Sequence, residues 1–573
     1  MVNVKNLFGM AVMATALVGC SSNDNLAPDG HEGNQAGTAY AKFTIQLPTV
    51  SGTRADDPKP GTPSFEGGTA DEYAVKDAAL LLFQKEGSDF KFKEVVDLGN
   101  MEPWTASKPG GGGITTTAKL TAKITTAEVG ANKGYYALIV LNNNSETAPK
   151  ITYPAVGQTY ADWSQKEANA TANYLKYDNG FFMANAPKYV AGAPETLVEI
   201  KNIYASKQQA ENSTATTVYV ERGLAKVSLA STSAKHVDIT DGNYAGDKVD
   251  IEGWTLDVTN TKTYPVHVTE GLWADTWKTA TTPAATNGAS MDRFHDTKLT
   301  SEFPRVYWGL DPNYSTNFAS VADCEREFTM ATKGNFKTGA EAKKAQYCLE
   351  NTFDIDHMVQ GQTTRVLFSA KYTPDNFADG ETFYKFGNSP KLWHAADVVA
   401  QIKAKAQEVL GEADANKVTV TLAAEGNDMT KSGVRLVAAA NISHGETALN
   451  DEQVDQINAK LGFKKATSTD AAVGLSTYES GVSYYVARVM HFNGLTPWAP
   501  GNDTYAGNNA NWLGRYGVLR NNWYELSVSS VSGPGYPDVP KVNPTDPDDV
   551  NDQYINVEVK ILDWAKRSQS IDL

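Results

Sequence analysis

The stretch that most constrains this chain is a strict alternation over Ala39–Leu47, AYAKFTIQL. Apolar and polar residues take turns along it, and the apolar side includes the large residues Phe43, Ile45 and Leu47. A period of two is typical of a β-strand that buries one face. Pro48 ends such a strand, because proline has no N–H to donate to a neighbouring strand. The segment therefore predicts a strand anchored by Phe43, Ile45 and Leu47.

A basic residue, Arg54, stands shortly after this strand in the polar run SGTRADDPKPGTP. Exposed polar loops are preferred sites of proteolysis, and a trypsin-like enzyme would cut here between Arg54 and Ala55. A regular strand is thus followed at once by a cleavage site. We predict that the rest of the chain is organised around the removal of this strand.

The chain begins with MVNVKNLFGMAVMATALVGC, in which a basic start precedes an apolar region too short to cross a bilayer. That region ends in LVGC, which looks like a bacterial lipobox. Residues 1–19 are therefore predicted to be a lipoprotein signal peptide, and Cys20 the residue that carries the lipid. Residues 20–54 would then be a propeptide that contains a polar tether and the removable strand. The alternative is an ordinary signal peptide with a chance cysteine.

Composition places the chain among soluble globular proteins with more than one domain. It has 573 residues, of which 41% are hydrophobic and 21% charged, and its net charge is −16. The acidic balance argues against binding to nucleic acid and against an electrostatic hold on anionic lipid. Membrane attachment is therefore predicted only through the lipid on the precursor.

Besides Cys20, the predicted lipidation residue, the chain has two cysteines, Cys324 and Cys348. They could form one disulfide in an oxidising compartment, or they could be two unpaired buried thiols. The spacing in the sequence does not decide between these alternatives, because bridging depends on the distance between the two Cα atoms.

Motifs for catalysis are absent from the sequence. The eight histidines are scattered, with no HExxH and no His/Cys pair at the spacing of metal ligands. No G-x-S-x-G turn and no dinucleotide-binding glycine motif is present. We therefore expect no enzymatic activity, no catalytic residue, no metal site and no cofactor. A carboxylate pair assembled in three dimensions is the alternative that motifs do not exclude.

Strand-like runs recur along the chain and indicate a mainly β fold with a few short helices. The pattern starts afresh after residue 236, so we predict an N-terminal domain over 55–236 and a C-terminal domain over 237–532. The predicted strands are Ala78–Gln84, Ala118–Thr126, Tyr135–Asn142, Thr217–Ala230, Lys248–Val258, Arg305–Gly309, Thr364–Tyr372, Lys417–Ala423, Gly433–Ala440, Ser483–Phe492 and Tyr524–Val531. The predicted helices are Ala161–Lys176, Leu392–Leu410, with Gly411 as its end, and Asn450–Leu461.

The C-terminal region, residues 533–573, is predicted to be an arm that carries a strand. Gly533–Gln553 is rich in proline and aspartate, which favours an extended segment outside any sheet. The strand Tyr554–Leu562 follows, and its apolar face carries four regularly spaced anchors. These anchors are Ile555, Val557, Val559 and Ile561.

Five sequence features together resemble one family. They are the lipobox with a propeptide ending in Arg54, Val220–Arg222 with Ala225–Val227, Tyr347–Thr352 followed by Thr363–Val366, Arg520–Tyr524, and the closing INVEVKILDWAKRSQSIDL. The chain resembles the major fimbrial subunits of the Bacteroidales, the fimbrillins or type V pilins, and within them the Mfa-type shaft proteins of minor fimbriae.

This resemblance implies two transthyretin-like β-sandwich domains in tandem and a structural role in a cell-surface fimbria that mediates adhesion and biofilm formation. It implies export as an outer-membrane lipoprotein, removal of the N-terminal strand by an Arg-specific surface protease, and polymerisation by donor-strand exchange. Ile555, Val557, Val559 and Ile561 would then be the donor residues. The implied partners are identical subunits, anchor and tip or accessory proteins, and host or bacterial receptors. The alternative function is a tip or accessory adhesin, or another surface lipoprotein that binds glycan or protein.

Overall fold

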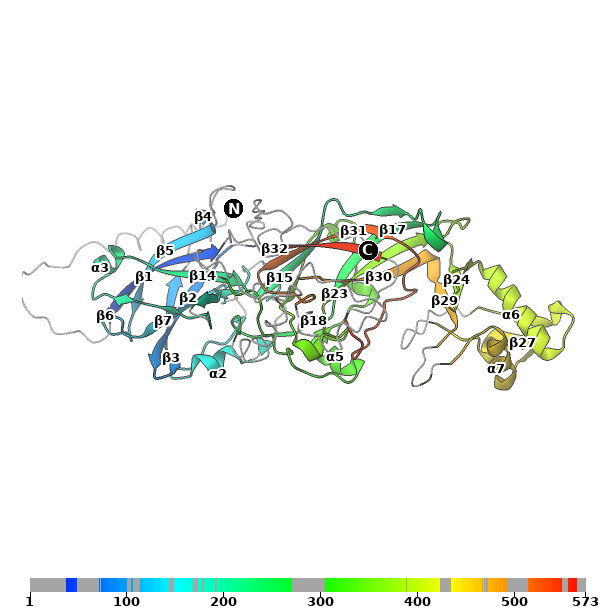
Figure 1. Cartoon of the computed structure of the whole chain (residues 1–573), viewed down its shortest axis with the longest axis horizontal. Coiled ribbons are helices and arrows are strands. Elements are labelled where there is room, and N and C mark those ends of the chain that lie inside the picture. Colours follow the sequence, from blue (N-terminus) through cyan, green and yellow to red (C-terminus); the bar gives the residue numbers. More distant parts are fainter. Residues whose placement is uncertain are drawn as a thin grey trace, which may run out of the picture.

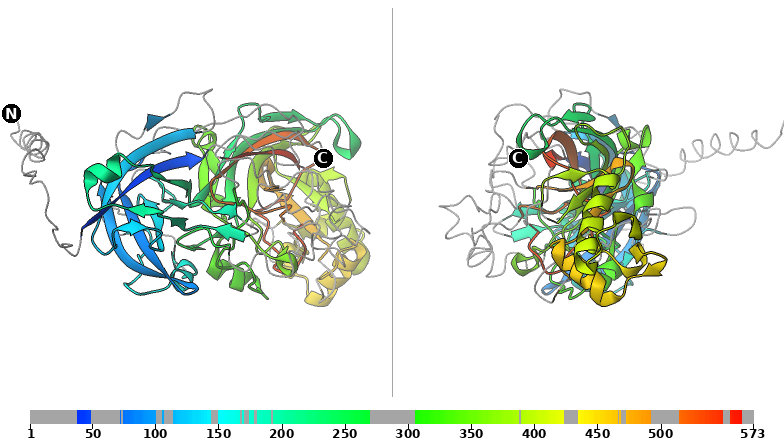
Figure 2. Two further views of the ribbon diagram at one scale, coloured as in Figure 1. Left: turned by 60° about the vertical axis from the view of Figure 1, so that its left-hand side comes forward. Right: turned by 90° about the vertical axis from the view of Figure 1, so that its right-hand side faces the viewer.

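The computed structural model arranges three parts in a row along its longest axis. An N-terminal β domain is followed by a central β-sandwich and then by a smaller lobe with helices (Figure 1 and Figure 2). The residues that the structure describes are 38–48, 72, 74–99, 105–106, 114–143, 149–166, 168–169, 174–177, 180–190, 193–269, 305–387, 389–422, 434–465, 467, 472–491, 514–548 and 555–563. The predicted mainly β class is confirmed.

The N-terminal domain is one sheet with the strand order β3-β2-β7-β9-β14-β1-β5-β4, and β12 pairs with β7 off this path. Its strands are β1 (Ala39–Pro48), β2 (Ala78–Glu86), β3 (Asp89–Gly99), β4 (Thr105–Ala106), β5 (Ile114–Ile124), β7 (Tyr135–Leu141), β9 (Met183–Asn185), β12 (Val198–Glu199) and β14 (Thr216–Arg222). The predicted strands near β2, β5 and β7 are confirmed.

The strands β2 and β7 are buried on both faces, which explains why their sequences are continuously apolar. Leu80 and Leu82 belong to a cluster with Ile45 of β1. Leu81 and Phe83 point the other way and join a second cluster that includes Trp163. β1 therefore closes one of two hydrophobic layers in this domain.

The chain passes from the first domain to the second at Gly223, between β14 and β15 (Leu224–Leu229). The single strand predicted over Thr217–Ala230 is thus two strands in different sheets. A Cβ atom at Gly223 would lie 2.4 Å from the hydroxyl oxygen of Tyr174, so no larger residue fits at this crossing. The crossing lies ahead of the domain boundary predicted after residue 236.

The central part is a sandwich of two sheets. One has the order β22-β15-β31-β32 and the other the order β16-β17-β23-β30, with β21 paired to β17. The strands are β16 (His236–Asp238), β17 (Lys248–Asp257), β21 (Lys337–Thr338), β22 (Gln346–Leu349), β23 (Arg365–Thr373), β30 (Val482–Arg488), β31 (Asn522–Val531) and β32 (Ile555–Asp563). Trp254, Tyr485 and Tyr524 fill the layer between the sheets.

A separate lobe, which the sequence did not predict as a unit, is inserted between β23 and β30 and has its own core. Its elements are β24 (Phe383–Phe386), β25 (Leu392–Trp393), α6 (Ala395–Leu410), β26 (Val418–Val420), β27 (Ile442–His444), β28 (Thr447–Ala448), α7 (Asp451–Lys460) and β29 (Leu475–Tyr478). Both predicted helices are confirmed. Gly411 ends α6 in the left-handed region, at φ 63°.

Short elements complete the fold. They are β6 (Gly130–Ala131), β8 (Ala168–Asn169), β10 (Lys188–Val190), β11 (Ala193–Glu195), β13 (Asn202–Ile203), β18 (Thr259–Asn260), β19 (Lys262–Thr263), β20 (Phe328–Thr329), α2 (Tyr160–Ser164), α3 (Lys207–Glu211) and α5 (Val321–Glu327), together with single 3₁₀ turns.

Three sequence predictions differ from the structure. The helix predicted over Ala161–Lys176 is wrong beyond Ser164, because β8 follows α2 and pairs with β19. The strands predicted over Arg305–Gly309 and Gly433–Ala440 form only isolated bridges within their described residues. Short apolar runs of this kind give no ladder when the neighbouring segment is itself irregular.

Candidate functional site

The strand β1 lies inside the N-terminal sheet, between β5 and β14 (Figure 1). It runs antiparallel to β5, with Phe43 opposite Leu120, and parallel to β14, with Ile45 opposite Val218. Its apolar face is at most 2% exposed. The predicted strand and the burial of its apolar face are therefore confirmed, while its removal stays a prediction.

Two further contacts hold β1 near its start. The backbone N–H of Tyr40 donates to the carbonyl of Tyr204 at 2.8 Å, and the N–H of Tyr204 returns a bond to the Tyr40 carbonyl at 2.9 Å. The ammonium of Lys42 donates to the carbonyl oxygens of Glu211, at 2.7 Å, and Ser213, at 3.2 Å. These two carbonyls lie at the C-terminal end of α3, where a cation is favoured.

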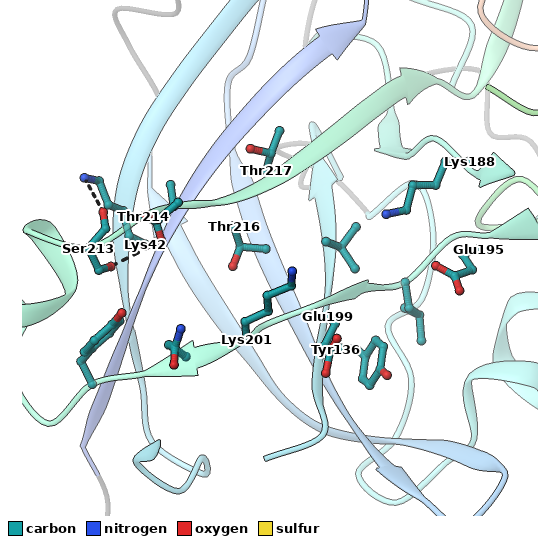
Figure 3. Close-up of a pocket in the computed structure, with 15 residues that line it drawn as sticks. Lys42, Tyr136, Lys188, Glu195, Glu199, Lys201, Ser213, Thr214, Thr216 and Thr217 are labelled. Atoms are coloured by element: carbon teal, nitrogen blue, oxygen red, sulfur yellow. Dashed lines mark hydrogen bonds between the residues drawn. The ribbon is translucent and has the colours of Figure 1, made fainter. Parts of the chain in front are cut away.

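A polar cavity of about 400 Å³ lies beside β1, between the segment Leu197–Lys201 and the start of β14 (Figure 3). Lys42 of β1 forms part of its wall, and Lys188, Lys201 and Glu199 also line it. The sequence analysis did not predict this cavity, because its lining comes from segments that are far apart in the chain. Removal of β1 would take Lys42 out of the wall and open the cavity toward the vacated position.

Taking β1 out of the sheet would leave a gap of two strand spacings, roughly 10 Å, between β5 and β14. Both neighbours would lose hydrogen-bond partners along this gap. Each of the buried side chains Phe43, Ile45 and Leu47 contributes roughly 1.5–3 kcal/mol through its burial. Their sum is of the order of a whole domain's stability, so the gap is a strong acceptor for another strand.

The C-terminal strand β32 is paired within its own chain. It runs antiparallel to β31, from Ile555 opposite Val531 to Asp563 opposite Asn522, and forms the end of its sheet. The predicted strand over Tyr554–Leu562 is thus present, with Tyr554 outside the described residues. The side chains of Ile555, Val557, Val559 and Ile561 also lie outside what the structure describes, so the donor role stays a prediction.

The segment before β32 packs against the central sandwich over residues 533–548. The hydroxyl of Tyr485 donates to the Gly533 carbonyl at 3.0 Å, and the guanidinium of Arg365 donates to the Pro540 carbonyl. The described part of the predicted arm is therefore docked on the sandwich by side-chain hydrogen bonds. Prolines prevent a strand ladder, but their carbonyl oxygens still accept hydrogen bonds from side chains.

A buried ionic group surrounds Glu221 at the crossing between the two domains. Nδ1 of His267 lies 2.6 Å from Oε1 of Glu221, and Nη2 of Arg305 donates to Oε2 at 3.2 Å. Burial alone would raise the pKa of Glu221, but the positive charges of His267 and Arg305 outweigh it and hold the pKa below its ordinary value. This group ties two residues from beyond the crossing, His267 and Arg305, to β14.

A second buried pair joins Lys226 of β15 to Glu72 at 2.7 Å. The hydroxyl of Tyr347 donates to the same carboxylate at 2.6 Å, and Nε of Arg222 donates to the Glu72 carbonyl at 2.9 Å. The motifs around Arg222, Lys226 and Tyr347 thus serve the contact between domains. Their partners Glu72, His267 and Arg305 carry no local signal in the sequence that could have identified them.

The cysteines Cys324 and Cys348 are buried and unbridged. Cys324 lies in α5 and Cys348 in β22, in two separate hydrophobic clusters, so the disulfide considered from the sequence is absent. Burial raises the pKa of the Cys324 thiol to about 11 and that of Cys348 to about 12. The alternative of two buried thiols agrees with the structure.

The lipidation and cleavage residues Cys20, Arg54 and Ala55 lie outside the described residues, so both modifications stay predictions. Within the described residues, no group of three or more His, Cys, Asp and Glu side chains is placed to hold a metal ion. None of the helices in that part of the chain has the length and apolar character needed to span a membrane.

Comparison with known proteins identifies the C-terminal region. Residues 476–570 match the family model described as the C-terminal part of fimbrillin, major fimbrial subunit protein type IV. A fimbrilin from Porphyromonas gingivalis has 11% identity and a TM-score of 0.36, over 92% of this chain and 99% of that chain. A fimbrial assembly protein from Parabacteroides distasonis has 12% identity and a TM-score of 0.28, over 63% of this chain and 97% of that chain. No curated protein matches the sequence.

The matched region contains β30, β31, the docked segment and β32. Over these residues the chain is similar to the C-terminal part of fimbrillin, which supports the resemblance noted in its sequence.

Proposed function

We propose that this chain is a structural subunit of a cell-surface fimbria that is activated by cleavage after Arg54 and polymerised by donor-strand exchange. In this scheme the precursor is exported as a lipoprotein through Cys20, and its own β1 blocks the acceptor groove. An Arg-specific surface protease then separates β1 from the rest of the chain. The C-terminal strand β32 of another copy takes its place.

The observation that carries the proposal is the position of β1. A strand at the edge of a sheet has one ladder partner and can leave at lower cost than an interior strand. β1 instead has ladder partners on both sides and a fully buried apolar face, so that its loss creates a deep groove with two unpaired walls. Such a strand is suited to block a groove until a covalent cut releases it.

The donor fits this groove by its pattern. Ile555, Val557, Val559 and Ile561 repeat with the same period of two as the apolar face of β1. The segment 533–554 ahead of them could span about 70 Å once detached and extended. A cut makes the exchange irreversible, so subunits stay inert until they meet the protease at the cell surface.

The cleavage step is tested by Arg54→Ala, with Lys59→Ala as the matched control. Pro60 follows Lys59, and trypsin-like enzymes cut poorly before proline, so the control should mature normally. We expect Arg54→Ala to accumulate as precursor and to lose the ladders of surface polymer on an immunoblot. Normal ladders in Arg54→Ala, or a mature N-terminus other than Ala55 in mass spectra of the wild type, would contradict the proposal.

The donor step is tested by Val557→Asp and Val559→Asp, with Asn556→Ala as the control on the opposite face. A carboxylate in an apolar groove costs several kcal/mol unless it is paired, so both Asp variants should be processed but not polymerise. Thermal melts of the monomers separate this effect from misfolding, since β32 also pairs with β31 in its own chain. Polymerisation at the wild-type level by both Asp variants would exclude β32 as the donor.

A further inference from the structure

The outer wall of the position held by β1 is basic. Lys119 and Lys123 of β5 are both exposed and point away from the apolar core, between inward residues such as Ala122. In the β1–β5 register, Lys119 lies opposite Thr44 and Lys123 opposite Tyr40. No residue of β1 between Ala39 and Leu47 is acidic.

These two lysines form no ion pair with any residue that the structure describes. The resident strand adds a further cation, Lys42, on the same outward face. Once β1 leaves, Lys42 leaves with it, whereas Lys119 and Lys123 stay on β5. The acceptor groove therefore keeps a cationic rim that the resident strand does not neutralise.

The donor strand carries one glutamate at the centre of its apolar pattern. Glu558 has Val557 and Val559 on either side, then Ile555 and Ile561, so the apolar pattern is symmetric about Glu558. Four of the five inward positions of β1, those at 41, 43, 45 and 47, are likewise symmetric about Thr44. When all four donor anchors fill these positions, Glu558 takes the place of Thr44 whichever way the donor runs.

We propose that Glu558 of the incoming subunit pairs with Lys119 of the accepting subunit and sets the register of the donor strand. This inference rests on the proposed function. It names a contact between the donor strand of one subunit and the groove of the next. Directly opposed charges of opposite sign stabilise a strand pair, and like charges destabilise it. A slip of two residues would bring Lys560 or Asn556 opposite Lys119 and would leave one inward position without its anchor.

The position of Thr44 is flanked by exposed residues on both neighbouring strands. Thr44 itself is 7% exposed, whereas its two cross-strand neighbours, Lys119 on β5 and Thr217 on β14, are exposed. A glutamate in place of Thr44 would carry its carboxylate out to the level of these neighbours. The pair would thus form at the solvent edge of the groove, where neither charge has to be buried.

Cysteine cross-linking of assembled fimbriae tests the register. We compare three double variants that combine Lys119→Cys with Glu558→Cys, Asn556→Cys or Lys560→Cys, after mild oxidation and boiling in SDS without reductant. The expected result is a reductant-sensitive ladder for Lys119→Cys with Glu558→Cys and much weaker ladders for the other two. A stronger ladder from either other pair would overturn the proposed contact while leaving donor-strand exchange intact. If all three variants form polymer but none gives a cross-linked ladder, the result would count against both the Glu558–Lys119 contact and donor-strand exchange.

Charge exchange tests the pair itself. Lys119→Glu and Glu558→Lys should each slow polymer formation roughly two- to fivefold, and the double variant should restore it. Lys123→Glu is the matched control on the same wall, and its expected effect is smaller. Melts of the precursors should be unchanged for Lys119→Glu, because Thr44 is the opposing residue before cleavage. Failure of the double variant to recover would overturn the pair.

Discussion

Truncating Phe43 to alanine measures how strongly the resident strand is held. The Phe43 ring is 0% exposed and packs in the cluster that contains Leu80, Ile139 and Val218. Removing a fully buried phenylalanine side chain typically costs about 3–5 kcal/mol, since it loses both transfer energy and packing contacts. The total stability of a domain is only about 5–15 kcal/mol, so we expect Phe43→Ala to remove a large part of it.

The assay is urea unfolding of the uncut precursor without its leader, followed by a time course with an Arg-specific protease. The matched control is Gln46→Ala, on the other face of β1. The Gln46 side-chain oxygen is buried and has no hydrogen-bond partner among the described residues, so its removal loses no hydrogen bond and should not lower the stability. After the cut, β1 is held by noncovalent contacts alone. Its release from Phe43→Ala should therefore be roughly a hundredfold or more faster than from the wild type.

Two results would refute this reasoning. Equal loss of stability in Phe43→Ala and Gln46→Ala would show that the two faces of β1 are not buried differently. A large loss of stability in Phe43→Ala with an unchanged rate of strand release would show that release does not require extraction of this anchor. In that case β1 would leave only when the neighbouring strands unfold with it, and no intact groove would remain.

Three further outcomes are expected. Glu221→Gln should lower the free energy of unfolding by about 3–5 kcal/mol, because it breaks a buried charged group, and unchanged urea unfolding would contradict this. The pKa of Glu221 is lowered in the folded chain, so its contribution is complete above the ordinary glutamate pKa of about 4.3 and is lost as the pH falls through the lower folded value. Between those pH values the free energy of unfolding should thus depend less on pH in Glu221→Gln than in the wild type. Finally, the denatured chain that starts at Ala55 should bind two maleimide labels, at Cys324 and Cys348, without prior reduction, and a mass without labels would show a disulfide.

Local patterns predicted the elements whose environment is uniform along their length. The alternation of Ala39–Leu47 reports one buried and one outward face, and β1 has that arrangement. The apolar repeat of α6 and the glycine after it likewise reflect contacts and backbone geometry within one element. Such features depend on residues close in sequence, so a single sequence is enough to identify them.

The features that the sequence did not predict depend on contacts between distant segments. The strand predicted over Thr217–Ala230 divides between two sheets at Gly223, where the backbone lies close to Tyr174. The docking of residues 533–548 depends on side chains such as Arg365 and Tyr485, which meet carbonyl groups far along the chain. A proline-rich composition indicates the absence of a ladder, but it does not report hydrogen bonds that side chains donate to the segment.

The pairing of β32 with β31 raises the question of what would drive β32 to another subunit. β32 lies at the end of its own sheet and has one ladder partner there. The position of β1 has a ladder partner on each side. In the proposed exchange one ladder would be lost and two would be gained, and each net backbone hydrogen bond contributes about 0.5–1.5 kcal/mol. The docked segment opposes the exchange, since its contacts with residues such as Arg365 must break before β32 can reach a neighbour. In this scheme cleavage permits the exchange by freeing β1 to dissociate, and the second ladder then favours β32 in the empty position. The docked segment would keep uncut subunits from exchanging early.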